Sequence, residues 1–350
     1  MKYGKIIDQL ALYFRATAVL AVAFTLPVAA IADEVVIVNG DRITGQVVRQ
    51  DAGALRLKTA YAGTLEIEWE QVQQLILDEP VTVILNDDRV LDIDQFFREG
   101  DQYVLHPVSQ APEIKVDYAQ VKVIEPDPWE LGQGHNFTGR VNIAIENEKG
   151  NSEKNEFDLD FSMNNRWRKN NLLVMGELEY DTTRGFTSTD NWSVMANLDH
   201  TFSRKWYYAG SVMLKSDKFA DLKLRTMLGP GIGYRFYDSQ ALNLRIEAGP
   251  YYLSDDFYDQ PDASFWGPAW FVDYDQMVWK NRLQLYHRQT GFQAVDNTDK
   301  LLWRSWTGVR VPLIAGLVGS VEYEIDYDSE PAVEAETTDQ TFKLKLGYKW

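Results

Sequence analysis

Charged side chains recur at every second position in several segments, a spacing that places them on one face of a β-strand. The acids are Asp158, Asp160, Glu177, Glu179, Glu322, Glu324 and Asp326, and the bases are Arg225, Arg235, Arg282, Arg288, Arg304, Arg310, Lys343 and Lys345. If these segments form the wall of a closed barrel, the charges line its lumen. Two interpretations stay open: a transverse field that orients a polar solute in a narrow pore, or ion pairs that fill the lumen and brace its wall.

The chain offers little for catalysis. It has no cysteine, and its four histidines are His106, His135, His200 and His287. A lipid hydrolase would place a histidine and a serine together at the outer rim of a barrel, and His200 is followed closely by Ser203. Its expected position is a periplasmic turn, however, which favours an interfacial residue. No metal-ligand set, phosphate loop or nucleophile elbow is recognisable, so we predict no metal and no cofactor.

Twelve segments of about ten residues would position these charges, because each alternates apolar and polar residues as transmembrane strands do. They run from about Asn136 to Trp350, and the last one, 342–350, alternates aromatic and aliphatic residues with lysines. None of the residues assigned to the apolar faces is Asp, Glu, Lys or Arg. The sequence therefore predicts an all-β fold with a 12-stranded antiparallel transmembrane barrel over 129–350. The ninth segment, around Leu283 to Arg288, is the weakest.

A soluble β-sandwich also alternates, but its strands are usually shorter. The connections favour the barrel, since long external loops and short periplasmic turns are typical of one. The expected long connections are 146–156, 181–190, 215–221, 254–264, 289–300 and 328–339, and the short ones are 203–205, 237–241 and 313–316. A soluble sandwich that binds a ligand remains the non-membrane alternative.

The first 32 residues predict export. Lys2, Lys5 and Arg15 precede an uncharged apolar run, which ends in Ala30-Ile31-Ala32, a small-residue cleavage site. The run is short for a spanning helix and Pro27 interrupts it, so a cleaved signal peptide is favoured over an anchor. The net charge of −17 argues against nucleic-acid binding.

The last residue, Trp350, ends an alternating strand and is a candidate assembly signal. A terminal aromatic residue is usual in the signal that outer-membrane assembly machinery reads. Together with the aromatic content of 13%, which suits a lipid–water boundary, this predicts the outer membrane of a Gram-negative bacterium. The expected partners are outer-membrane lipids and the assembly machinery.

Residues 33–128 form a different, repeated unit. Asn39-Gly40-Asp41-Arg42 and Asn86-Asp87-Asp88-Arg89 each follow a β-branched run and indicate short turns. We predict two copies of a small SH3-like half-barrel or meander in the periplasm, ending at Pro126-Asp127-Pro128. It is either a spacer or a contact for a peptide, glycan or protein that the sequence does not identify.

Three short motifs resemble a known family. Leu228-Gly229-Pro230-Gly231-Ile232-Gly233-Tyr234-Arg235-Phe236, Asn39-Gly40-Asp41-Arg42-Ile43-Thr44-Gly45 and Tyr61-Ala62-Gly63-Thr64-Leu65 are similar to phrases in salt-induced outer-membrane proteins, a family filed as a domain of unknown function. The resemblance covers most of the chain after the export segment. It implies an outer-membrane barrel and brings no activity or catalytic residue.

Three successive segments contain a proline beside glycine: Pro230, Pro250 and Pro268. Each proline removes a donor from the ladder, which indicates either ordinary β-bulges or a weakened patch that opens laterally. Taken together, the sequence predicts a passive outer-membrane role, as a narrow channel or an envelope-structure protein. A lipid-modifying hydrolase is the alternative.

Overall fold

The computed structural model describes residues 32–51, 53–109, 112–117, 120–148, 153–238, 241–279, 282–297, 299–331 and 336–350. The predicted signal peptide lies outside the described residues except for Ala32. The chain divides into two compact units between Glu125 and Pro126. In the described part, no helix has the length and apolar character needed to cross a membrane.

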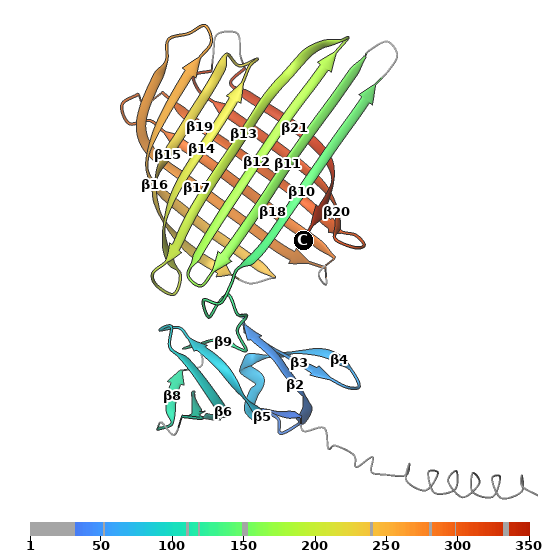
Figure 1. Ribbon diagram of the computed structural model, residues 1–350, viewed down its shortest axis with the longest axis vertical. Helices are drawn as coiled ribbons and strands as arrows, with labels where there is room; N and C mark the ends of the chain where they lie inside the picture. Colours follow the sequence, from blue (N-terminus) through green and yellow to red (C-terminus); the bar gives the residue numbers. More distant parts are fainter. Residues whose placement is uncertain are drawn as a thin grey trace, which may run out of the picture. The chain divides into compact units, whose positions relative to one another are not determined.

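The first unit is a nine-stranded sheet, coloured blue to cyan in Figure 1. Its strands are β1 (Asp33–Ile37), β2 (Arg42–Asp51), β3 (Ala54–Thr59), β4 (Gly63–Glu68), β5 (Val72–Leu85), β6 (Val90–Glu99), β7 (Gln102–Pro107), β8 (Ile114–Asp117) and β9 (Val121–Ile124). They pair in the order β4-β3-β2-β1-β5-β6-β7-β8, and β9 pairs with both β2 and β5. The sheet therefore curls around one core, in which the rings of Trp69, Phe96 and Tyr103 pack 4.3–5.4 Å apart between centroids.

The sheet has two halves, β1-β2-β3-β4 and β5-β6-β7-β8, which the pairing of β1 with β5 joins. The Asn39-Gly40 turn joins β1 to β2, and Gly40 has the positive φ (91°) that favours glycine. The second motif, Asn86-Asp87-Asp88-Arg89, turns between β5 and β6, and its Asp88 adopts the same left-handed region (φ 66°). Strand β5 links the two halves, because its first part pairs with β1 and its last part pairs with β6 and β9.

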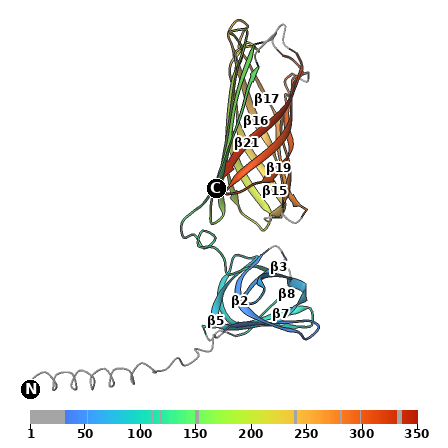
Figure 2. The ribbon, with the colours of Figure 1, turned by 90° about the vertical axis from the view of Figure 1, so that its right-hand side faces the viewer.

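The second unit is a closed antiparallel barrel of twelve strands, as the alternation predicts. Figures 1 and 2 show it in green to red. Its strands are β10 (Asn136–Glu148), β11 (Lys154–Trp167), β12 (Asn170–Thr183), β13 (Phe186–Thr201), β14 (Trp206–Asp217), β15 (Leu222–Asp238), β16 (Leu242–Phe257), β17 (Ala263–Val278), β18 (Leu283–Gln293), β19 (Leu301–Pro312), β20 (Leu317–Asp328) and β21 (Thr338–Lys349). The ninth strand, β18, is the shortest at 11 residues.

Several predicted loops are wrong because the strands extend through them. Residues 181–190 belong almost entirely to β12 and β13, which meet at a two-residue turn, Arg184-Gly185, with both φ values positive (53° and 79°). Much of 254–264 likewise belongs to β16 and β17. These strand ends are polar on both faces, so the alternation that identifies a strand is missing there although the backbone ladder continues.

The barrel has the reverse distribution of a soluble protein, with apolar residues outside and charges inside. Along β21, Phe342, Leu344 and Leu346 are 57–67% exposed, whereas Lys343 and Lys345 between them are 6–8% exposed. The barrel is broad in Figure 1 and narrow in Figure 2, which is turned by 90°, so its cross-section is flattened. Flattening brings opposite walls within reach of single side chains.

Candidate solute site in the barrel lumen

Of the fifteen charged residues predicted from the sequence to line the lumen, fourteen face the barrel interior. The prediction is wrong for Arg282, which is exposed in the turn before β18. The other fourteen lie on seven strands: Asp158 and Asp160 on β11, Glu177 and Glu179 on β12, Arg225 and Arg235 on β15, Arg288 on β18, Arg304 and Arg310 on β19, Glu322, Glu324 and Asp326 on β20, and Lys343 and Lys345 on β21. They do not form one cluster. Most belong to an ion-pair layer in the middle of the barrel, while Arg235, Arg288 and Arg310 line a separate cavity near one end.

Some ion pairs of this layer join opposite walls of the barrel. We call these cross-wall pairs the waist. Lys215 on β14 lies 2.5 Å from Asp326 on β20, and these strands are six apart in either direction around the ring. Arg304 on β19 contacts Glu177 on β12 and Glu324 on the neighbouring β20. Such contacts are possible only because the cross-section is flattened.

The lysines of β21 extend this layer along the wall. Lys345 contacts Asp160 (2.8 Å) on one side and Glu322 (2.5 Å) on the other. Lys343 contacts Glu179 and also Glu324, the latter at 3.1 Å. The geometry therefore favours paired charges that brace the wall over the transverse field, because acids and bases alternate within single clusters.

The barrel has two kinds of end. One end of the barrel, which we call the turn end, holds Asn136 and Trp350. The connections β11–β12, β13–β14, β15–β16, β17–β18 and β19–β20 lie at this end. The opposite end is the loop end. There Arg225 donates to both carboxylate oxygens of Asp255 (2.6 and 2.7 Å) and to Asp328 (3.0 Å).

An apolar cluster occupies the lumen beside the waist. It is formed by Met227, Tyr251, Leu253, Ala269, Phe292, Ala294 and Leu302, with Met213 and Phe265 packed against it. This apolar cluster was not predicted from the sequence. Its residues stand at the inward positions of β15–β19, and the alternation along these strands was the signal that could have found them.

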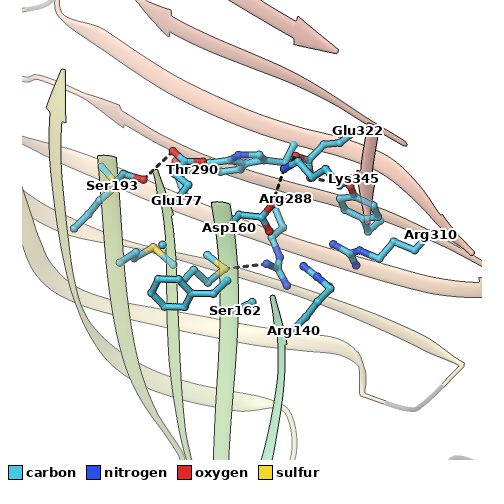
Figure 3. Close-up of a pocket in the computed structure, with 17 residues that line it drawn as sticks. Arg140, Asp160, Ser162, Glu177, Ser193, Arg288, Thr290, Arg310, Glu322 and Lys345 are labelled. Atoms are coloured by element: carbon cyan, nitrogen blue, oxygen red, sulfur yellow. Dashed lines mark hydrogen bonds and ion pairs between the residues drawn. The ribbon is translucent and has the colours of Figure 1, made fainter. Parts of the chain in front are cut away.

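The lumen holds at least four small cavities, and these four become smaller away from the turn end. The largest of the four, of about 270 Å³, lies at the turn end. It shares Arg140, Ser162, Arg288 and Arg310 with a second cavity of about 70 Å³ (Figure 3). Cavities of about 50 and 20 Å³ continue past Met213 and Thr290. The two smallest cavities are large enough for a few water molecules at most.

The largest cavity, here called the basic cavity, has an unusual charge for so acidic a chain. Its described lining holds seven cationic side chains and two carboxylates; the cations are Arg140, Arg166, Arg235, Arg245, Arg288, Arg310 and Lys349, and the acids are Asp273 and Asp275. Of these nine residues, Arg235, Arg288 and Arg310 are predicted from the sequence to line the lumen. The others stand at inward alternating positions, so register alone could have found them.

Carboxylates hold most of these cations in place. Asp273 accepts from Arg245 (3.2 Å) and Arg288 (3.0 Å), and Asp275 accepts from Arg310 (3.1 Å). The buried Asp199 on β13 pairs with Arg235 (2.5 Å) and with Arg245 (3.4 Å). Arg288 also donates to the Met175 thioether at 2.9 Å, across the barrel.

His200 lies near the turn end of β13, on the same face as Leu198. Its ring lies 5.2 Å from that of Tyr208 between centroids, and its Nδ1 is 2.8 Å from Asn170 Oδ1. Among the described contacts of His200, none involves Ser203. Within the described ranges, no group of three or more histidine and carboxylate side chains is arranged to hold a metal.

The three prolines lie in the neighbouring strands β15, β16 and β17. Pairing of β15 with β16 stops after Leu228–Tyr252 and resumes at Ile232–Ala248 in the same register. The prediction of β-bulges is therefore wrong at Pro230 and Pro250, since a bulge would shift the register. Two prolines facing each other leave a short gap in the ladder instead, because neither has an N–H to donate.

Comparison with solved structures finds β-barrels with low identity. The chain is similar to the NanC porin (11% identity, TM-score 0.40, covering 61% of this chain and 100% of that one). It is also similar to the translocator domain of the autotransporter NalP from Neisseria meningitidis (13%, 0.36, 63% and 89%). A third is the outer-membrane channel DcaP of Acinetobacter baumannii (11%, 0.30, 77% and 94%).

No curated protein matches the sequence. A family model does match, over residues 141–350, which include nearly all of the barrel and none of the front module. The chain thus belongs to the family described as "Protein of unknown function, DUF481".

Proposed function

We propose that this protein is an outer-membrane β-barrel that serves as a narrow channel for small polar solutes. The observation that carries the proposal is the inverted distribution along the barrel strands, with lysines inside and leucines outside on β21. Turning a lysine outward at the bilayer midplane would cost about 2–4 kcal/mol. An apolar exterior therefore fits lipid, and a charged interior fits water and solute.

Three further features support the outer membrane. The export segment predicts passage into the periplasm, where the front module would then remain. Closure of the barrel pairs most of its backbone without helices, which suits a structure that spans a membrane. Trp350, which pairs with Gly139 beside β21, is an aromatic residue of the kind that forms interfacial girdles. The twelve strands are an even number, so Asn136 and Trp350 lie at the same end, which we assign to the periplasm.

The lumen favours a channel over a purely structural barrel because its cavities overlap from the turn end to the waist. The waist blocks free passage in this conformation, as Lys215 and Asp326 join opposite walls. The Lys215 side chain is long and both partners are partly exposed, so solute passage requires that this contact and the bridge from Arg304 to Glu177 separate. We expect low conductance with frequent closures.

Two measurements test the proposal. The chain refolded in detergent should migrate differently on gels before and after heating, as closed barrels do. In planar bilayers it should give small, discrete current steps. Folded protein without any current would contradict the channel and leave an envelope-structure role. Protein that stays soluble without detergent would contradict the membrane assignment.

The periplasmic assignment needs its own test. Proteinase K added to intact cells should leave residues 33–125 uncut, and should cut them after the outer membrane is permeabilised. Cleavage in intact cells would place the front module outside. A tag on the loop between β20 and β21 should become accessible in intact cells, which controls for the orientation of the barrel.

A further inference from the structure

We infer that the basic cavity binds a compact, hydroxylated anion with two or more carboxylate or phosphate groups. This inference rests on the proposed channel and specifies its solute. The first argument is charge: the cavity lining sums to +5 within a chain of net charge −17. Counting Asp199 and Asp238, which pair with lining arginines from beside the cavity, still leaves +3. Like charges accumulate in a confined space when a ligand of opposite charge compensates them.

The second argument is a cation without an acid. Among the described residues, no carboxylate pairs with Arg140 or with Lys349, although both line the cavity. The Nε of Arg140 is buried and has no hydrogen-bond partner. Figure 3 shows that Arg140, Arg288 and Arg310 direct their guanidinium groups into the same space. A buried, unsatisfied donor on a charged group is costly, and an anion among the three would satisfy it.

The third argument is an acceptor that needs a donor. Asn171 lines the cavity and is 6% exposed, and its amide nitrogen donates to Asp199 at 3.0 Å. Because the Asp199 carboxylate can only accept, the amide orientation is fixed. The Asn171 Oδ1 is then a buried acceptor without a partner. Another anion group cannot fill it, but a ligand hydroxyl can.

The size and shape of the site limit the ligand. A volume of about 270 Å³ is just below the usual range for small-molecule pockets, and the waist prevents a long polymer from threading through. Arginine binds carboxylate and phosphate oxygens in pairs. The neutral lining supplies further hydroxyl and amide groups for a hydroxylated ligand: Thr138, Ser162, Asn164, Asn243 and Gln284.

Isothermal titration of the detergent-refolded chain at low ionic strength tests the site directly. The probes are citrate for carboxylates and glucose 6-phosphate for phosphates. Tricarballylate, which is citrate without its hydroxyl, probes Asn171, and glucose is the neutral control. We expect saturable binding of citrate, glucose 6-phosphate or both, weaker binding of tricarballylate than of citrate, and no binding of glucose.

Arg140→Gln is the variant of choice, because removing an unpaired cation leaves no carboxylate orphaned and should preserve folding. Its dissociation constant for the anion should rise roughly tenfold or more, since it loses a charge-assisted contact. Lys349→Gln should act in the same direction. Lys218→Gln carries the same charge change at the loop end, on an exposed side chain, and should bind like the unaltered protein.

The outcomes separate this inference from the channel. Anion binding without bilayer current would support the cavity and contradict the channel. Current without saturable anion binding would support the channel and contradict the anion site. Binding that Arg140→Gln and Lys349→Gln leave unchanged, while both variants remain folded by the gel assay, would place the anion elsewhere and overturn the inference.

Discussion

Gly139 and Trp350 close the barrel by exchanging two backbone hydrogen bonds, from Gly139 N to Trp350 O (3.2 Å) and from Trp350 N to Gly139 O (3.1 Å). The indole ring lies over Gly139, where any Cβ would overlap it. The last residue of the chain is therefore part of the seam between β10 and β21, and the glycine provides the space for its ring.

The Gly139–Trp350 contact predicts a coupled pair of substitutions. Gly139→Ala should lower the free energy of unfolding by about 1–3 kcal/mol, a usual cost of overpacking. The loss should be much smaller in a Trp350→Leu background, because the nearest atoms to the new Cβ all belong to the indole. A double-mutant cycle from urea unfolding in detergent measures this coupling. Additive effects would show that the ring does not limit residue 139.

Gly249 predicts a sharper effect at the gap between β15 and β16. A Cβ there would overlap the Pro230 carbonyl oxygen, which is backbone and cannot turn away. Gly249→Ala should therefore cost about 2–3 kcal/mol or prevent folding. Gly210→Ala on β14 is the matched control, since a Cβ at that residue would have no neighbour within 4 Å. If urea unfolding gave the same loss of stability for Gly249→Ala and Gly210→Ala, β15 and β16 would not be closely packed at Gly249.

The strand count and the outward register could be predicted from the sequence because lipid imposes a strict rule, an uncharged face at every second residue. The pairing inside could not. Lys215 follows Val212 and Leu214 at an inward position, so its direction was readable, but its partner Asp326 is six strands away. That contact depends on the flattening of the barrel, which arises from all twelve strands together and leaves no local pattern.

The basic cavity shows the same limit for the candidate site. Arg140 was on the polar face of the first segment, yet nothing near it in sequence marks it as unpaired. Arg288 and Arg310 approach it from β18 and β19, and the carboxylates that pair with these two come from β17. Strand ends were also missed, because residues such as Thr182 and Thr189 extend a ladder whose two faces are both polar.

The waist predicts that one lysine limits the current. Lys215→Gln should increase single-channel conductance, because it separates the walls that Lys215 and Asp326 join. The variant should remain folded, because the Asp326 carboxylate keeps Arg304 at 3.7 Å. Lys218→Gln, with the same charge change outside the lumen, should conduct as before. An unchanged or lower conductance in Lys215→Gln would place the constriction elsewhere.

The seam between β10 and β21 has few backbone hydrogen bonds. Strands β10 and β21 pair over four residue pairs in the described part, from Arg140–Lys349 to Ile143–Leu346, whereas β11 and β12 pair over fourteen. Beyond Ile143, both strands continue toward the loop end without pairing to each other. Opposite residues of an antiparallel pair have Cβ atoms close enough for a disulfide, and the chain has no cysteine to interfere.

Two cysteine pairs therefore distinguish the bonded from the unbonded part. Ile143→Cys with Leu346→Cys should oxidise readily in the folded barrel, as counted by maleimide labelling of the remaining thiols after denaturation. Ile145→Cys with Leu344→Cys, the next outward-facing positions along the same line, should remain largely reduced. Similar oxidation of both pairs would mean that the seam continues to the loop end in the membrane, and that the gap opens no path between the lumen and the lipid.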